Sequence, residues 1–179
     1  KSEEELMQLK AAGLDMVYMG IESGDPQVLK DVKKGVTREE MIEAGRKLKR
    51  CGILCSATLI SGLGGRQRLR EHAIASASLI SAIKPDYVGF LTLMIDPQAP
   101  VYSKIVSGEL ELLNPEDVVE EMKLFLQNVD SEGTVFRSNH ASNYVILKGT
   151  LNEDIPSMLA YLRQVEEQGK YREERWRRF

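Results

Sequence analysis

Three mostly apolar runs of strand length, separated by helix signals, constrain the fold of this chain more than any other feature. They are residues 15–21, 53–60 and 86–95. Runs of this length and composition are typical of strands buried on both faces of a parallel sheet. The sequence therefore predicts strands that alternate with helices.

Helix-start signals support this alternation. Ser2 and Thr37 open capping boxes. Asp25 and Asn114 each precede a proline at the first helical position, and Asn152 precedes the last amphipathic run. We predict that helices begin at these residues.

The order strand, helix, strand, helix, strand predicts right-handed crossovers and a parallel sheet. Ligands of such folds bind at the carboxyl ends of the strands. These ends are residues 20–24, 61–65 and 94–97, and we look for function there.

The totals exclude several classes of protein. The hydrophobic content of 42% is too high for a disordered chain, and the net charge of −3 makes a nucleic-acid partner unlikely. No apolar stretch has the length of a membrane span. Cys51 and Cys55 are the only cysteines, which argues against a disulfide framework and predicts a cytoplasmic protein.

Glu22 follows the first apolar run directly. A carboxylate there can accept hydrogen bonds from ligand hydroxyls or amines, and Ser23 and Gly24 allow backbone and ligand to approach closely. The alternative is a carboxylate that caps the helix beginning at Asp25.

Two segments carry a resemblance to a known family. They are LDMVYMGIESGDPQVLKDVKKG, residues 14–35, and GILCSATLISGLGG, residues 52–65. In order and spacing they resemble strands four and five of the radical S-adenosylmethionine (SAM) superfamily, in its elongator and coproporphyrinogen-oxidase branch. The resemblance implies a partial (β/α) barrel of strands four to six over residues 1–100. Residues 101–179 would be a partly helical C-terminal extension.

The resemblance also implies roles for side chains near the methionine and ribose of SAM. Glu22, with Ser23 beside it, would bind the methionine or ribose part. Lys34 would pair with the methionine carboxylate as a point charge, where relatives mostly have arginine. Thr58 would lie near the ribose hydroxyls.

Other positions would contact the adenine. Ile60 would pack on the ring, and the backbone at Leu93 and Met94 would lie beside it, with Gly62 in the adjoining turn. Gly64 and Arg66 depart from the Gly-Leu-Pro-Gly-Glu of the family, which puts the role of that glutamate in doubt. The glycines are not a phosphate loop, because the Gly-Lys-Ser/Thr ending is absent.

No metal ligand is predicted in this chain. The family's cluster loop is Cys-x3-Cys-x2-Cys, but the third position after Cys51 and Cys55 is Thr58. We expect both cysteines to be buried small hydrophobes. The four-iron four-sulfur cluster of the family would then have its ligands outside this chain, in a longer protein from which the chain is cut.

A dense polar run, residues 137–144, offers candidates for substrate binding: Arg137, Asn139, His140 and Asn143. His140 is also the candidate for proton transfer. The alternative is a hydrogen-bonded loop that caps the sheet. His72 is expected to be a surface histidine, and Trp176 and Phe179 to dock the charged tail.

The predicted function is therefore that of a radical SAM enzyme acting on an unknown substrate, with this chain inactive by itself. Two alternatives stay open: a radical-SAM-like protein that carries haem without catalysis, and a barrel enzyme without a cluster. The first predicted strand would lack a neighbour on one side, so we also expect self-association through that edge.

Overall fold

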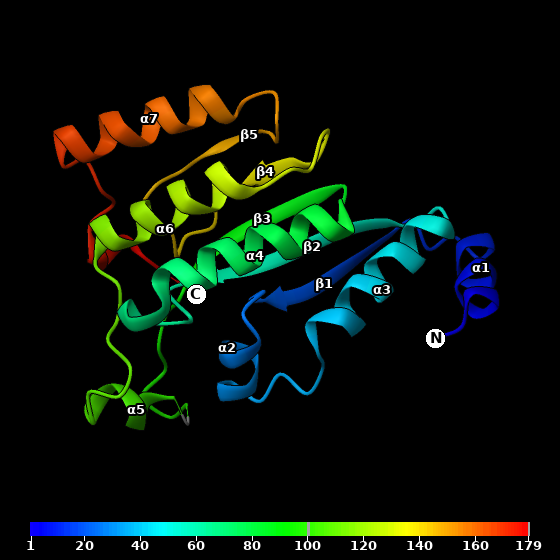
Figure 1. The fold of residues 1–179 in the computed structure, drawn as a ribbon, viewed down its shortest axis with the longest axis horizontal. Helices are drawn as coiled ribbons and strands as arrows, with labels where there is room; N and C mark the ends of the chain where they lie inside the picture. The colour runs from blue at the N-terminus through cyan, green and yellow to red at the C-terminus, as the bar shows by residue number, and fades with distance from the viewer. Residues whose placement is uncertain (100, 179) are drawn as a thin grey trace.

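Over residues 1–99 and 101–178, which our computed structural model describes, five strands form one sheet in chain order (Figure 1). They are β1 (Met16–Glu22), β2 (Leu54–Ser61), β3 (Tyr87–Thr92), β4 (Val135–Arg137) and β5 (Lys148–Thr150). β1 to β4 are parallel, and β5 is antiparallel to β4. The predicted α/β fold with a parallel sheet is confirmed, and β5 is an addition to it.

Most helices begin where the capping signals predict. They are α1 (Glu3–Ala11), α2 (Pro26–Asp31), α3 (Arg38–Arg50), α4 (Leu69–Ile83), α5 (Tyr102–Val106), α6 (Pro115–Asn128) and α7 (Ile155–Gln168), with the short 3-10 helices η1 (Arg66–Arg68) and η2 (Glu174–Trp176). The side chains of Ser2, Asp25, Thr37 and Asn114 cap as predicted. α5 was not predicted, since no side chain caps it.

The predicted cap of the last helix is wrong. Asn152 has a left-handed backbone with φ of 70°, and its side chain accepts a hydrogen bond from the Ser131 amide at 2.9 Å. Asn152 therefore holds a turn, and Asp154 is the residue that precedes α7.

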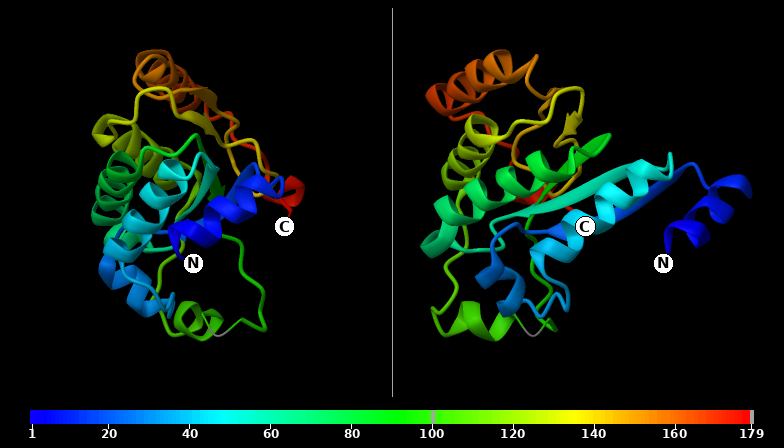
Figure 2. Two further views of the ribbon diagram at one scale, coloured as in Figure 1. Left: turned by 90° about the vertical axis from the view of Figure 1, so that its right-hand side faces the viewer. Right: turned by 45° about the vertical axis from the view of Figure 1, so that its right-hand side comes forward.

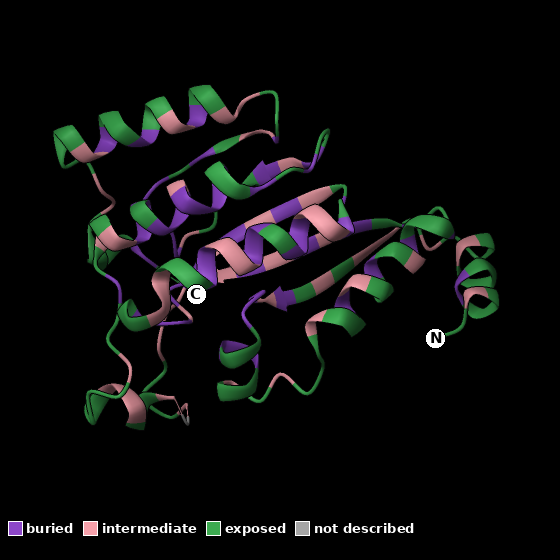
Figure 3. Ribbon diagram, viewed as in Figure 1, coloured by how far each residue is buried: buried purple, intermediate pink, exposed green. Residues whose placement is uncertain are grey.

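The helices α3, α4, α6 and α7 lie side by side over one face of the sheet (Figure 2). Burial alternates along β2 accordingly: Cys55, Ala57 and Leu59 are buried, whereas Ser56 and Thr58 are half-buried. Burial alternates in the same way along β3, which Figure 3 shows in bands of buried and intermediate colour. The described residues thus cover one face of the sheet, which we call the covered face, and leave an open face, where burial on both faces was expected.

The core lies between the covered face and the helices. Phe90 of β3 packs against Phe125 of α6 and Phe136 of β4, with ring centroids 4.8 and 5.4 Å apart. Segments on both sides of residue 100 therefore share one sheet and one core. The predicted boundary at residue 100 stays a prediction about the longer protein.

Among the described residues, β1 is the edge strand of the sheet and pairs with β2 alone. The missing neighbour on one side was predicted. Tyr18, in the middle of β1, is 79% exposed although it is a large aromatic residue. The edge and the open face meet at this side chain.

Candidate functional site

The carboxyl end of β1 has an unusual backbone. Glu22 has φ of 65°, in the left-handed region, and the register with β2 shifts between Gly20 and Glu22. A residue other than glycine in this region costs on the order of 1–3 kcal/mol, and such strain gathers at functional sites. The surrounding structure therefore holds Glu22 in a fixed, strained position.

Glu22 and Lys34 form an ion pair at this strand end. Lys34 Nζ lies 3.2 Å from Glu22 Oε1, and each side chain is about one quarter exposed, 24% and 25%. A Cβ on Gly20 would lie 2.3 Å from Glu22 Oε1 and 3.4 Å from Lys34 Nζ. The missing side chain at Gly20 therefore makes the space that the pair occupies.

This pair matches the chemistry of an amino-acid group. The ammonium of Lys34 suits a carboxylate, and the carboxylate of Glu22 suits an ammonium or hydroxyl group. The structure thus brings together Glu22, predicted to bind the methionine or ribose part of SAM, and Lys34, predicted to pair with its carboxylate.

Ser23 and Gly24 serve the turn after β1. Ser23 is fully buried, and its hydroxyl accepts the Asp25 amide hydrogen at 3.0 Å. The Gly24 amide donates to Ser76 Oγ at 2.9 Å, and a Cβ on Gly24 would lie 2.2 Å from the Ala75 carbonyl oxygen of α4. The structure thus uses Ser23, a predicted ligand contact, inside the turn, and the close approach at Gly24 is to a helix.

Asp25 completes this turn. Its carboxylate accepts the Gln27 amide hydrogen at 2.8 Å, so it caps α2, and it pairs with Arg68 at 2.8 Å. The helix cap therefore belongs to Asp25, and Glu22 has its side chain free for the pair with Lys34.

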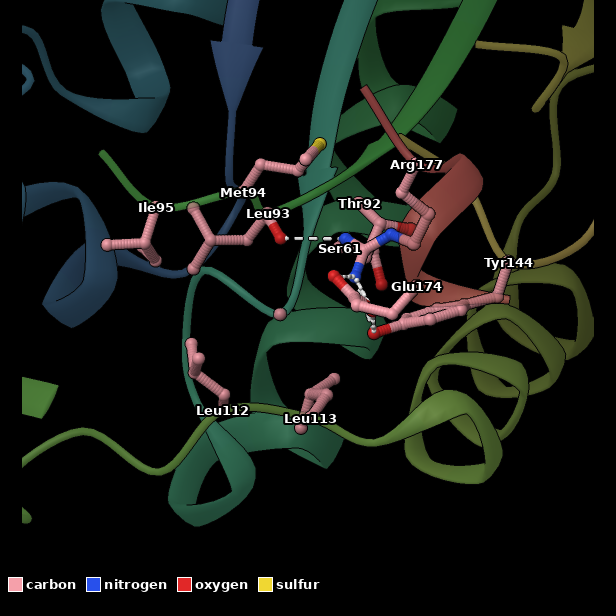
Figure 4. A pocket seen from close by; sticks show the side chains of 11 residues that line it. Ser61, Thr92, Leu93, Met94, Ile95, Leu112, Leu113, Tyr144, Glu174 and Arg177 are labelled. Carbon is pink, nitrogen blue, oxygen red and sulfur yellow. Dashed lines mark hydrogen bonds and ion pairs between the residues drawn. The ribbon is translucent and has the colours of Figure 1, made fainter. Parts of the chain in front are cut away.

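A pocket of about 420 Å³ lies at the ends of β2 and β3. Three of the predicted cofactor-binding residues, Gly62, Leu93 and Met94, line it, and Figure 4 shows Leu93 and Met94 there. Thr58 lies on the open face and lines a second pocket, and Ile60 is half-buried on the same face. We call the first cavity the strand-end pocket.

The other walls of the strand-end pocket include side chains that were not among the predicted site residues. Leu112 and Leu113 precede α6, Tyr144 belongs to the polar run, and Glu174 and Arg177 belong to the C-terminal tail. Arg177 also changes the prediction for the tail. Arg177 is buried there, whereas Trp176 is 56% exposed, and Phe179 lies outside the described residues. An arginine in a charged tail carries no signal of burial in the sequence.

A buried network supports the turn at Gly62. Glu121 of α6 accepts hydrogen bonds from the Ser61 hydroxyl and from the Gly62 amide, the latter at 2.9 Å. His72 Nδ1 lies 2.8 Å from the other carboxylate oxygen. The surface position predicted for His72 is wrong, because α4 turns this residue inward and leaves it 1% exposed.

The polar run divides between two tasks. Arg137, Asn139 and His140 line the second pocket, of about 350 Å³, with Thr58 on the open face. Asn143 is buried instead, and its amide donates to the Phe90 carbonyl at 2.8 Å. Three of the four substrate candidates thus share a cavity, and Asn143 joins the run to β3.

Both cysteines are buried free thiols, as expected. Burial, with the nearby Asp86 carboxylate, raises the pKa of the Cys55 thiol to about 11. Among the described residues no three His, Cys, Asp or Glu side chains gather as metal ligands, so an iron–sulfur cluster does not fit the residues present.

No helix in the described ranges is long and apolar enough to cross a membrane.

This chain is similar to known proteins in parts of its sequence and in its fold. The model of the Radical SAM superfamily matches residues 1–74. A putative methylthiotransferase of Methanocaldococcus jannaschii is 40% identical over 58 residues, which are 32% of this chain and 13% of that protein. An uncharacterized methyltransferase of Pyrococcus horikoshii is 27% identical over 104 residues, 58% of this chain and 22% of that protein.

Solved structures agree. Elp3 of Methanocaldococcus infernus, with an N-terminal deletion, has a TM-score of 0.65 at 22% identity over 94% of this chain and 40% of that one. Methylornithine synthase has a TM-score of 0.54 at 16% identity over 92% of this chain and 55% of that one. The chain therefore resembles the radical SAM superfamily in sequence over residues 1–74 and shares the fold of these solved structures over most of its length. It spans less than two thirds of the length of each of these four proteins, and its branch within the superfamily stays a prediction.

Proposed function

We propose that this chain is the SAM-binding part of a radical SAM enzyme. The enzyme would cleave SAM reductively to a 5′-deoxyadenosyl radical that acts on a substrate not yet identified. We place the ligands of the [4Fe–4S] cluster outside the described residues, which offer none, and the protein in the cytoplasm, without a membrane or nucleic-acid partner.

The observation that carries this proposal is the Glu22–Lys34 pair above Gly20. A strained carboxylate and an ammonium lie 3.2 Å apart at the ligand-binding end of a parallel strand. On binding, Lys34 would turn to the methionine carboxylate and Glu22 to the amino or ribose group. Each charge would then exchange its present partner for a matching charge or donor of the ligand.

The adenosine would lie along the ends of β2 and β3. Thr58 offers a hydroxyl for the ribose from the open face, and Ile60 offers an apolar surface for the ring. The strand-end pocket would take the base between Gly62 and the backbone at Leu93 and Met94.

The substrate would bind at the second pocket, on the same open face. Arg137, Asn139 and His140 line this pocket. His140 Nδ1 lies 2.9 Å from Ser142 Oγ, an interaction that orients the ring for proton transfer through its other nitrogen.

The test of this proposal is the yield of 5′-deoxyadenosine from the full-length protein with its cluster. Glu22→Gln and Lys34→Ala should each lower the yield by about tenfold or more, since each removes a charged hydrogen-bond partner. Lys30→Ala, an exposed lysine on α2, and Cys55→Ala should leave it unchanged. A wild-type protein that forms no 5′-deoxyadenosine would contradict the proposal and favour a carrier without catalysis.

Binding by the chain itself is a second test. The methionine end would be held by Glu22 and by a flexible lysine alone, without a cluster to chelate it. We therefore expect calorimetry to give a dissociation constant for SAM in the millimolar range or weaker. A micromolar constant would show that the described residues hold SAM in another way.

A further inference from the structure

The C-terminal tail, residues 171–178, is locked to the end of the sheet by one arginine. The side chain of Arg177 is 5% exposed. Its guanidinium donates to the carbonyls of Ser142 at 2.6 Å and Leu93 at 3.1 Å, and to the Glu174 carboxylate at 2.7 and 2.8 Å. It also stacks over the ring of Tyr144, 4.0 Å from the centroid.

This arrangement requires arginine and a docked tail. A charge taken out of water needs several hydrogen-bond partners to offset its desolvation, and only the planar fork of arginine reaches acceptors on several sides at once. A second arginine adds to the docking, because the Arg172 amide donates to the Tyr144 carbonyl at 2.8 Å. The tail is therefore a fixed wall of the strand-end pocket.

The tail presents a carboxylate at that pocket. Burial alone would raise the pKa of the Glu174 carboxyl, but hydrogen bonds from Arg177 and Tyr144 hold it below its usual value. The Glu174 side chain is still 69% exposed, so a ligand can reach it. Figure 4 shows Glu174 and Tyr144 on one side of the pocket, with Leu112 and Leu113 nearby.

We propose that Glu174 is a specificity-determining residue that accepts a hydrogen bond from the exocyclic amine of a purine nucleoside, and that Arg177 is its positioning residue. The proposal rests on the proposed function, which puts the adenosine end of SAM in this pocket. An anionic acceptor beside apolar walls favours a flat base that donates an amine hydrogen over one with a carbonyl at the same place. The tail would thus select adenosine over inosine.

Trp176 offers a built-in probe of the tail. It is the one tryptophan of the chain, and it lies beside Arg177, with the Arg175 guanidinium 5.2 Å from its ring. Its emission, excited at wavelengths where purines do not absorb, reports whether the tail is docked. Saturation-transfer NMR with 5′-deoxyadenosine and 5′-deoxyinosine at millimolar concentrations measures binding independently.

Three variants separate the roles. Glu174→Gln should keep the tail docked and weaken 5′-deoxyadenosine by about tenfold, with little change for 5′-deoxyinosine. Arg177→Gln should shift the Trp176 emission to the red and remove the preference between the two nucleosides. Arg178→Gln, an exposed neighbour, should alter neither signal.

Each outcome decides the question. A wild-type preference for 5′-deoxyadenosine that disappears in Glu174→Gln supports the proposal. If the wild type binds 5′-deoxyadenosine and Glu174→Gln leaves the preference unchanged, the role of the tail is wrong and the nucleoside site stands. If the wild type binds neither nucleoside, the site itself is wrong. Should Arg177→Gln unfold, Tyr144→Phe carries the test. It removes the hydroxyl that donates to Glu174 at 2.8 Å and accepts from Arg177, keeps the ring beneath the guanidinium, and should reduce the preference.

Discussion

The two faces of the sheet are made by the same strands and have opposite properties. On the covered face, Phe90 and Cys55 are buried against helices, whereas their neighbours Leu91 and Ser56 line a pocket on the open face. Side chains alternate between the faces with a period of two, so adjacent residues meet different environments. The covered face holds the fold together, and the open face carries Thr58 and the substrate candidates Arg137, Asn139 and His140.

The largest contrast should come from two adjacent residues of β3. Phe90→Ala removes a ring that packs on two others, so the free energy of unfolding should fall by about 3–5 kcal/mol. Leu91→Ala on the open face should cost about 1 kcal/mol or less. Urea unfolding of both variants checks this, and equal losses would show that the open face is covered in solution.

Two glycines should show the same contrast. Gly24→Ala would put a methyl group 2.2 Å from the Ala75 carbonyl oxygen, a backbone atom, and should cost about 1–3 kcal/mol. In Gly20→Ala the new methyl group meets the end of the Glu22 side chain, which can move. The free energy of unfolding, measured by thermal unfolding, should therefore change by less than about 0.5 kcal/mol. It should nevertheless lower the yield of 5′-deoxyadenosine in the full-length protein. A large loss of stability in Gly20→Ala would mean that the strand end tolerates no movement of Glu22.

Association through the open edge is the third contrast. Because β1 has a free edge and an exposed Tyr18, we propose that the chain forms dimers there. Tyr18→Lys should raise the dimer dissociation constant by about tenfold, whereas Tyr161→Lys on α7, also exposed, should not. Analytical ultracentrifugation measures both, and a wild-type monomer at all concentrations would refute the dimer.

The smallest expected effect is the pH dependence of stability that is due to the Cys55 thiol. The raised pKa of Cys55 means that the thiolate forms more easily in the unfolded chain. Its contribution to stability is therefore complete below about pH 9 and is lost as the pH rises toward about 11. Cys55→Ala should remove this part of the pH dependence in denaturant titrations.

Reaction with a thiol reagent compares the faces directly. Ser56→Cys, made in a Cys55→Ala background, should react at least about a hundredfold faster than Cys55 in the wild type, which must open first. Cys51→Ala in both proteins keeps the other thiol out of the measurement. Equal rates would show that the helices do not protect the covered face.

Local signals in the sequence predict much of the fold. Capping residues such as Thr37 and Asn114 begin helices because their side chains bond amides three residues away. The apolar runs become strands, and the first of them ends at Glu22, which pairs with Lys34. These signals work because cause and effect lie within a few residues of each other.

The predictions that were wrong or missing concern residues whose burial depends on distant contacts. The position of His72 depends on Glu121, 49 residues away, and the burial of Arg177 depends on the Leu93 carbonyl, 84 residues away. Neither residue type indicates burial, since histidine is intermediate in burial and arginine is mostly exposed in proteins.

The sequence by itself therefore determined the order of the first three strands and the helices between them, the parallel sheet and the strand end with Glu22. Only the tertiary structure decided which face of each strand is covered, that Ser23 and Asn143 are buried, and that the tail closes the strand-end pocket. The physical reason is that hydrogen-bonded caps and side-chain periodicity act along the chain. Burial, in contrast, is decided by which distant segments supply partners for a polar group.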